Sequence, residues 1–220
     1  FAEYVVAAEE ALALKPTNLT FEQAATVPVS AVTALQGLRA GQIQPGQKVL
    51  INGASGGVGT FAVQIAKTFG AEVTAVCSTS KRELMRALGA DHVIDYTKED
   101  FTQNGQRYDL ILAANGYQPL AAYQRALSPQ GIYVMTGGAT RQLFEVMLQG
   151  PWRSKQGGQK MANILASPNQ KDLLFMKELL EAGKVTPVID RCFPLPAVAD
   201  AIRYLEAGHA KGKVVITVAQ

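Results

Sequence analysis

Cysteine and histidine are scarce in this 220-residue sequence, which has two of each. Cys77 and Cys192 stand far apart and form no C-x-x-C pair, so we expect no disulfide framework and predict a reducing, cytoplasmic compartment. His92 precedes a short apolar run and His209 follows Gly208, and neither has a cysteine or histidine at ligand spacing. The sequence therefore predicts no metal site.

Long apolar runs and an excess of charge are also missing. No run approaches the roughly 20 apolar residues that cross a bilayer, and the sequence opens without a signal-peptide pattern. The formal net charge of +3 is too small to indicate a nucleic-acid partner. With 48% hydrophobic and 18% charged residues, the chain is expected to fold around a buried core, with neither a membrane span nor a nucleic-acid partner.

A glycine-rich loop lies between a predicted strand and a predicted helix. Residues 48–52 form a short apolar run, residues 53–59 read GASGGVG, and residues 60–69 have a helix pattern that ends at Gly70. A second strand-like run follows at residues 72–77. This order of strand, glycine turn, helix and strand is typical of the first βαβ unit of a dinucleotide-binding fold.

The glycine loop suits a pyrophosphate for physical reasons. A helix N-terminus offers unpaired N–H donors and the positive end of the helix dipole. Gly56 and Gly57 lack a Cβ atom, which lets backbone and phosphate approach, and Gly59 lets the helix pack on the strand. A strict G-x-G-x-x-G motif would need glycine where Ala54 stands, which leaves a purely structural glycine turn as the alternative. The strand and the helix around the loop favour the dinucleotide site.

The end of the second predicted strand indicates which dinucleotide is bound. An NAD site usually places Asp or Glu there to hold the ribose hydroxyls. Here the strand is followed by Ser78, Thr79, Ser80, Lys81 and Arg82, and no acid is present. Hydroxyls and cations suit a 2′-phosphate, so the sequence predicts NADPH. The alternative is that both cations only begin a solvated helix; the phosphate role is favoured for Lys81, and for Arg82 the two readings are balanced.

Along the rest of the chain, predicted strands and helices alternate. Alternation of this kind predicts an α/β fold, a Rossmann doubly wound parallel sheet with helices on both faces. We expect strands at residues 2–7, 48–52, 72–77, 92–95, 108–113, 132–136, 188–193 and 213–218. We expect helices from an N-cap at Thr20 to Pro28, and at residues 30–40, 60–69, 80–88, 119–127, 171–182 and 195–207, with a short helix at 143–148 between loops at 150–152 and 155–158.

Several motifs together resemble the medium-chain dehydrogenase/reductase superfamily, in its zinc-free quinone oxidoreductase branch. They are residues 1–5, 24–35, 53–59, 88–91, 94–96 and 212–215. The resemblance implies an NADPH-dependent oxidoreductase that transfers hydride to a small-molecule substrate, a quinone or an activated C=C or C=O, and that forms a homo-oligomer. Zinc-dependent relatives have a cysteine ligand where Val29 stands, so the resemblance also implies that no zinc is bound.

The resemblance implies a domain division as well. Residues 1–20 would be a remnant of a β-rich catalytic domain, residues 21–185 the NADPH-binding Rossmann domain, and residues 186–220 a segment that returns towards the catalytic domain. Family members carry most of that catalytic domain before the part matched here. We therefore expect this chain to be a piece of a larger protein, and no catalytic residue can be assigned in it.

The cofactor residues implied by the resemblance fall into three groups. The first would hold the pyrophosphate, the second the 2′-phosphate, and the third the nicotinamide and its ribose. These are, in that order, Ser55, Gly56, Gly57 and Val58; Ser78, Lys81 and Tyr96; and Thr33, Ala114, Asn115, Thr136 and Gly137. Two have simpler alternatives, since Tyr96 could pack over the third strand and Asn115 could belong to an ordinary turn.

Two other functions compete with this hypothesis. A short-chain dehydrogenase needs a Tyr-x-x-x-Lys pair for proton transfer, and no tyrosine in the sequence has a lysine four residues later. A non-catalytic NADPH-binding module, acting as a redox sensor or a structural protein, stays open because a fold does not determine a function.

Overall fold

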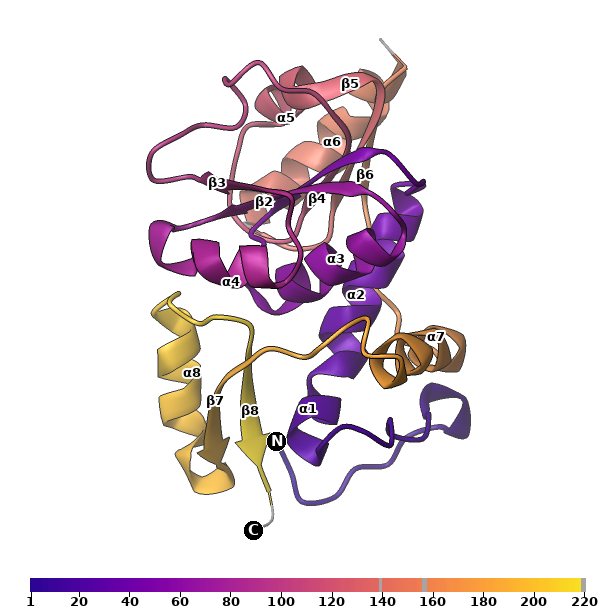
Figure 1. Cartoon of the computed structure of the whole chain (residues 1–220), viewed down its shortest axis with the longest axis vertical. Coiled ribbons are helices and arrows are strands. Elements are labelled where there is room, and N and C mark those ends of the chain that lie inside the picture. Colours follow the sequence, from indigo (N-terminus) through magenta and orange to yellow (C-terminus); the bar gives the residue numbers. More distant parts are fainter. Residues whose placement is uncertain (139, 156–157, 219–220) are drawn as a thin grey trace.

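The computed structural model describes residues 1–138, 140–155 and 158–218, and it contains a six-stranded parallel sheet (Figure 1). The strand order is β3-β2-β1-β4-β5-β6. The strands are β1 (Lys48–Asn52), β2 (Glu72–Cys77), β3 (His92–Asp95), β4 (Tyr108–Ala113), β5 (Leu127–Met135) and β6 (Lys160–Asn163). The order reverses between β1 and β4, which is the point where ligands bind in such sheets.

Helices cover both faces of this sheet because its strands send alternate apolar side chains to opposite sides. Val49 and Ile51 pack in the core under α2, α3, α4 and α7, whereas Leu50 packs in the core under α5 and α6. The predicted doubly wound fold is therefore confirmed. The helices are α1 (Phe21–Ala25), α2 (Val27–Ala40), α3 (Gly57–Thr68), α4 (Arg82–Ala87), α5 (Leu120–Ala126), α6 (Thr140–Lys155), α7 (Gln170–Glu181) and α8 (Val198–Glu206).

Local capping explains where the first helices begin. The Thr20 hydroxyl accepts the Gln23 N–H at 3.2 Å, and the Gln23 side chain accepts the Thr20 N–H at 3.0 Å, which forms the capping box of α1. The predicted N-cap is thus confirmed. Pro28 lies in the first turn of α2, where a missing N–H breaks no helical bond, so α2 begins at Val27 rather than after the proline.

The prediction is least accurate between β4 and α7. β5 begins at Leu127 rather than at residue 132, and β6 is absent from the prediction. The expected loop at 150–152 is wrong, since α6 continues through it to Lys155; residues 156 and 157 of the second expected loop lie outside the described residues. Val146 of α6 is 2% exposed, so packing against the sheet outweighs the local helix-breaking signal of glycine and proline.

A second, two-stranded parallel sheet pairs β7 (Ile189–Pro194) with β8 (Lys213–Thr217), and α8 lies between them in sequence (Figure 1). The expected strand at residues 2–7 is wrong. Tyr4 and Val5 there are 91% and 89% exposed, and the described residues give that segment no strand partner, which a strand requires. In the described part of the chain, no helix is long and apolar enough to cross a membrane.

Candidate functional site

The glycine loop connects the end of β1 to the start of α3. Gly53 has a φ of +78°, and a Cβ atom on it would lie 2.7 Å from the backbone nitrogen of Asn115, so a larger residue would not fit there. Gly56 is the N-cap residue of α3, and no side chain caps this helix. The first turn of α3 therefore presents backbone N–H groups at the loop, as anion sites do.

Three glycines of the loop have different surroundings. A Cβ atom on Gly59 would lie 2.3 Å from the carbonyl oxygen of Gly53, so this glycine lets α3 pack closely on the loop that follows the strand. A Cβ atom on Gly57 would lie 2.7 Å from Cδ of Lys213. A Cβ atom on Gly56 would meet nothing closer than the Gly53 oxygen at 3.6 Å, so the space beside Gly56 is open.

A cavity of about 440 Å³ lies at the carboxyl ends of β1, β2 and β3 and is bordered by the glycine loop; we name it the carboxyl-edge cavity. This is where ligands bind in doubly wound sheets. Its wall combines the loop with residues from the ends of three strands and from the segment before β8. The lining residues are Asn52, Gly53, Ser55, Gly56, Val76, Cys77, Lys81, Tyr96, Phe101, Asn115, Gly116, Tyr117, Gln118, Gly208 and Ala210.

Two residues predicted for the 2′-phosphate, Lys81 and Tyr96, line this cavity together. The Lys81 Nζ donates a hydrogen bond of 2.9 Å to the carbonyl oxygen of Ala210. Burial lowers the pKa of Lys81, and the nearby Asp190 carboxylate opposes this effect. Tyr96 is 62% exposed, so it does not simply pack over the third strand. The geometry thus brings one cation and one phenol to the same opening.

No Asp or Glu is among the described residues that line the carboxyl-edge cavity. The neighbouring acid, Asp95 at the end of β3, is 6% exposed. Its carboxylate accepts hydrogen bonds from the hydroxyls of Thr79 at 2.5 Å and Thr97 at 2.7 Å, which lower its pKa. This carboxylate is therefore already engaged by its own neighbours, and the described lining of the cavity contains no acid, in agreement with the lack of an acid directly after β2.

A smaller cavity of about 290 Å³ is also bordered by the glycine loop; we name it the loop cavity. The segment before β8 forms part of its wall, because the Gly212 N–H donates to the Ser55 carbonyl at 2.9 Å and Gly212 pairs with Gly56 in a parallel bridge. Its lining residues are Ser30, Gly53, Gly56, Gly57, Val58, Gly59, Ala114, Asn115, Leu205, Gly212, Lys213 and Val214.

Most of the predicted cofactor residues border one of these two cavities, but Thr33, Ser78, Thr136 and Gly137 border neither. Thr33 is 6% exposed within α2. A Cβ atom on Gly137 would lie 2.6 Å from the carbonyl oxygen of Ala114, so the turns after β5 and β4 are in contact. The roles of Thr33, Thr136 and Gly137 beside the nicotinamide, and of Ser78 at the 2′-phosphate, stay predictions.

Sequence reasoning assigned no role to Asn52, Phe101, Ala210 or Lys213, which border the cavities. Asn52 is 7% exposed, and its Nδ2 donates to the Tyr123 hydroxyl at 2.7 Å. A polar residue at the end of an otherwise apolar strand was the available signal for Asn52. Residues 212–215 carried the family resemblance but gave no local signal of their position, because only the tertiary fold brings this segment to the glycine loop.

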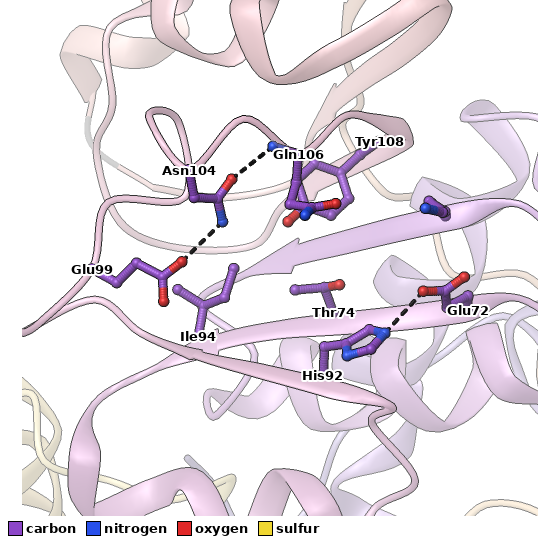
Figure 2. A pocket seen from close by; sticks show the side chains of 9 residues that line it. Glu72, Thr74, His92, Ile94, Glu99, Asn104, Gln106 and Tyr108 are labelled. Carbon is purple, nitrogen blue, oxygen red and sulfur yellow. Dashed lines mark hydrogen bonds and ion pairs between the residues drawn. The ribbon is translucent and has the colours of Figure 1, made fainter.

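A further cavity of about 270 Å³ opens at the opposite, amino edge of the sheet (Figure 2). Its polar side chains largely satisfy one another: His92 Nε2 lies 2.9 Å from Glu72 Oε1, and the Asn104 amide donates to Glu99 at 3.0 Å. Ligands of doubly wound sheets bind at the carboxyl edge, so we assign no function to this cavity.

The described residues contain no group of three or more His, Cys, Asp or Glu side chains that could hold a metal ion. Val29, which stands where zinc-dependent relatives have a cysteine ligand, is 64% exposed and has no donor atom. Both cysteines are free, and burial raises the pKa of the Cys77 thiol. The residues present at this position do not fit a zinc ion.

Comparisons with known proteins agree with this architecture. The NADPH-dependent alkenal/one oxidoreductase, chloroplastic, of Arabidopsis thaliana is 37% identical over 220 residues, which cover 98% of this chain and 52% of the relative. The mitochondrial NAD(P)H oxidoreductase RTN4IP1 of Mus musculus is 36% identical over 244 residues, covering 99% of this chain and 61% of the relative. The chain thus spans about half to three-fifths of the length of these relatives.

A solved structure and a family model complete the comparison. The quinone oxidoreductase from Coxiella burnetii matches with a TM-score of 0.83 and 29% identity, over 93% of this chain and 63% of that one. The family model described as "Zinc-binding dehydrogenase" matches residues 88–216, more than half of the chain. The chain therefore belongs to the zinc-binding dehydrogenase family, within the medium-chain dehydrogenase/reductase superfamily.

Proposed function

We propose that this chain is the NADPH-binding part of a zinc-independent oxidoreductase that reduces a quinone or an activated C=C or C=O. The observation that carries the proposal is the carboxyl-edge cavity, where Lys81 and Tyr96 meet beside an uncapped helix N-terminus and no acid lines the wall. The names of the relatives, an NADPH-dependent alkenal/one oxidoreductase and a quinone oxidoreductase, support the same cofactor and substrate class.

The residues at both ends of the carboxyl-edge cavity suit a dinucleotide. The first-turn N–H groups of α3 would bind the pyrophosphate, because the space beside Gly56 is open and no side chain occupies the helix end. Lys81 and Tyr96 would bind the 2′-phosphate by charge-assisted hydrogen bonds. NADH has a free ribose 2′-hydroxyl, which NAD sites usually hold with a carboxylate. The described lining of this cavity contains no carboxylate, so NADH should bind less tightly than NADPH.

The nicotinamide would lie at the other end, near the turns after β4 and β5. Asn115 lines both cavities and is exposed, so its side chain is accessible to a ligand there. When bound, the cofactor supplies hydride from nicotinamide C4, and the protein orients it and limits water access. Thr33, Thr136 and Gly137 are proposed to set that orientation, as the family resemblance implies.

The test is a titration of the purified chain with NADPH and with NADH, followed by nicotinamide fluorescence. Micromolar or tighter binding of NADPH with weaker binding of NADH is the expected result. Equal affinities, or no binding of either, would contradict the proposal. Consumption of NADPH with quinones and alkenals then separates an oxidoreductase from a non-catalytic NADPH-binding module, which would bind NADPH and transfer no hydride.

Two further predictions belong to this proposal. The expected homo-oligomer is testable by light scattering of the purified chain. The cytoplasmic location expected from two unpaired cysteines stays a prediction, and the names of two relatives give chloroplastic and mitochondrial locations for those proteins.

A further inference from the structure

Asn52 places a buried side-chain amide at the wall of the carboxyl-edge cavity. It is the last residue of β1 and lines the cavity directly before the glycine loop. Its Nδ2 donates a hydrogen bond of 2.7 Å to the Tyr123 hydroxyl. A Cβ atom on Gly116 would lie 3.2 Å from the same Nδ2, so glycine at 116 makes room for the amide. The amide is therefore held between the Tyr123 hydroxyl and the turn after β4.

Tyr123 is itself fixed by buried neighbours. It lies on α5 and is 0% exposed, and its ring is 5.9 Å from the Phe101 ring and 4.6 Å from the Tyr133 ring. Gln142 of α6, also fully buried, donates from its Nε2 to the Tyr133 hydroxyl at 2.5 Å. Burial raises the pKa of Tyr123, and hydrogen bonds with the Gln142 and Asn52 side chains oppose this effect. Two helices thus fix the hydroxyl that binds Asn52.

The oxygen of the Asn52 amide remains available to a ligand. Within the described part of the chain, no group donates a hydrogen bond to its Oδ1, and this atom is not sealed from solvent. Because Asn52 lines the carboxyl-edge cavity, the oxygen is accessible from there. The Tyr123 hydroxyl engages the nitrogen end of the amide, so the oxygen end is presented to the cavity before any ligand binds. Such preorganisation raises affinity, because less freedom is lost on binding.

We propose that Tyr123 is a positioning residue for the dinucleotide, which it serves by fixing Asn52 with Oδ1 towards the carboxyl-edge cavity. The inference rests on the proposed function and deepens it. Lys81 and Tyr96 line the same cavity and are proposed to bind the 2′-phosphate, so the adenosine half of the cofactor would lie there. A carboxamide oxygen only accepts hydrogen bonds, so its partner is a neutral donor of that half, either a ribose hydroxyl or the adenine amino group.

The first experiment is a double-mutant cycle on NADPH affinity, measured by calorimetry. Tyr123→Phe removes the hydroxyl and keeps the ring that packs on Tyr133, whereas Asn52→Ala removes the amide. Tyr123→Phe should weaken NADPH binding by roughly threefold to tenfold, the range for a neutral hydrogen bond, and Asn52→Ala by at least as much. In the Asn52→Ala background, Tyr123→Phe should have no further effect, because it acts only through that amide.

The control is Tyr108→Phe, which removes the hydroxyl of another buried tyrosine, at the opposite edge of the sheet. It should leave NADPH affinity unchanged, even where its unfolding temperature falls as far as that of Tyr123→Phe. A purely structural role of Tyr123 would weaken binding equally with and without the Asn52 amide. Additive effects, an equal loss in Tyr108→Phe, or wild-type affinity of Tyr123→Phe would overturn the inference and leave NADPH binding by the wild type intact. Failure of the wild type to bind NADPH would overturn the proposed function itself.

Nuclear magnetic resonance of the wild-type chain, labelled at asparagine, needs no variant. The Nδ2 proton of Asn52 that binds Tyr123 should exchange slowly with solvent before any ligand is added. ADP, which carries the adenosine half, should shift the side-chain carbonyl carbon of Asn52 and leave that of Asn104, at the opposite edge, unchanged. Inosine diphosphate lacks the amino group, so a retained shift assigns the donor to a ribose hydroxyl and a lost shift assigns it to the amino group. Fast exchange of the Nδ2 proton, or an Asn52 carbonyl that ADP does not shift, would overturn the inference.

Discussion

The ε-ammonium group of Lys81 donates a 2.9 Å hydrogen bond to the carbonyl oxygen of Ala210, a residue 129 positions further along the chain. The lysine follows β2 and the carbonyl precedes β8, so two distant segments meet over the carboxyl-edge cavity. A carbonyl oxygen satisfies one of the three ammonium donors and leaves the others for a phosphate. The return segment thus positions the residue that is proposed to select NADPH.

Replacement of Lys81 should change the cofactor preference. Lys81→Met keeps most of the apolar stem and removes the charge, so the free energy of NADPH binding should become less favourable by about 1.5–3 kcal/mol. NADH affinity should change little, because NADH lacks the 2′-phosphate. Fluorescence titration of both variants, Lys81→Met and the exposed-site control Lys184→Met, measures this. Parallel losses for NADPH and NADH in Lys81→Met would contradict the assigned contact.

Replacing Gly59 or Gly56 of the loop by alanine should affect two different properties. Gly59→Ala should lower the stability of the fold, and Gly56→Ala should weaken cofactor binding. Gly59→Ala places a Cβ atom 2.3 Å from a backbone oxygen, which cannot move aside cheaply, so the free energy of unfolding should fall by about 3 kcal/mol or more. Gly56→Ala has 3.6 Å of space and an ordinary φ of −83°, so its stability should stay within about 1 kcal/mol of the wild type.

The same Gly56→Ala change should weaken NADPH and NADH by at least about tenfold, because the new methyl group occupies the space proposed for the phosphates. Urea unfolding and fluorescence titration measure the two quantities. The assignment of these glycines is wrong if Gly56→Ala binds normally or if Gly59→Ala is as stable as the wild type.

Asp172 should stabilise the fold in a pH-dependent way. It is 5% exposed on α7 and accepts hydrogen bonds from Arg39 at 2.5 Å and Gln36 at 2.7 Å on α2. Burial raises its pKa, but the bonds from Gln36 and Asn169 and the charge of Arg39 outweigh burial, so the pKa lies below the ordinary 3.8. The carboxylate therefore stabilises the folded state above the unfolded pKa, and this contribution is lost as the pH falls through the folded pKa.

The corresponding variant is Asp172→Asn, which should lower the free energy of unfolding by about 1–3 kcal/mol at pH 7. Urea unfolding at pH 7 and at progressively lower pH tests this, and the difference from the wild type should shrink below about pH 4. A difference that stays constant with pH would mean that the charge of Asp172 is not the stabilising feature.

Elemental analysis of the purified chain should find no stoichiometric zinc. Val29 stands where zinc-dependent relatives have a cysteine ligand, and the described residues hold no cluster of metal-binding side chains. One zinc per chain that survives dialysis against a chelator would contradict this prediction, in spite of the family's description as zinc-binding.

The sequence predicted the first half of the sheet closely because its signals are local. The bounds of β1, β2, β3 and β4 agree with the prediction, since each strand is a short apolar run between glycine or polar turns. The length of α6 was misread because Gly150 and Pro151 are local helix-breaking signals, whereas burial of Val146 is a property of the assembled core. Residues 2–7 have strand composition, but composition supplies no neighbouring strand.

The sequence could predict only those residues of the candidate site that belong to a motif or directly follow a predicted strand. The glycine loop, Lys81 and Tyr96 follow β1, β2 and β3 closely, so topology alone places them at one edge of the sheet. Ala210 lines the carboxyl-edge cavity and Lys213 lines the loop cavity, and the bridge between Gly56 and Gly212 brings their segment to the glycine loop. No periodicity or spacing in the sequence encodes a contact between residues so far apart.

Gly212, which pairs with the glycine loop, is synthesised after all six strands described for the main sheet, the last of which ends at residue 163. Folding during synthesis proceeds from the N-terminus. The sheet can therefore assemble while the residues that complete the cavities are still in the exit tunnel. A nascent chain acquires its core before it acquires a finished binding site, so a dinucleotide stabilises the released protein rather than the intermediates that lead to it.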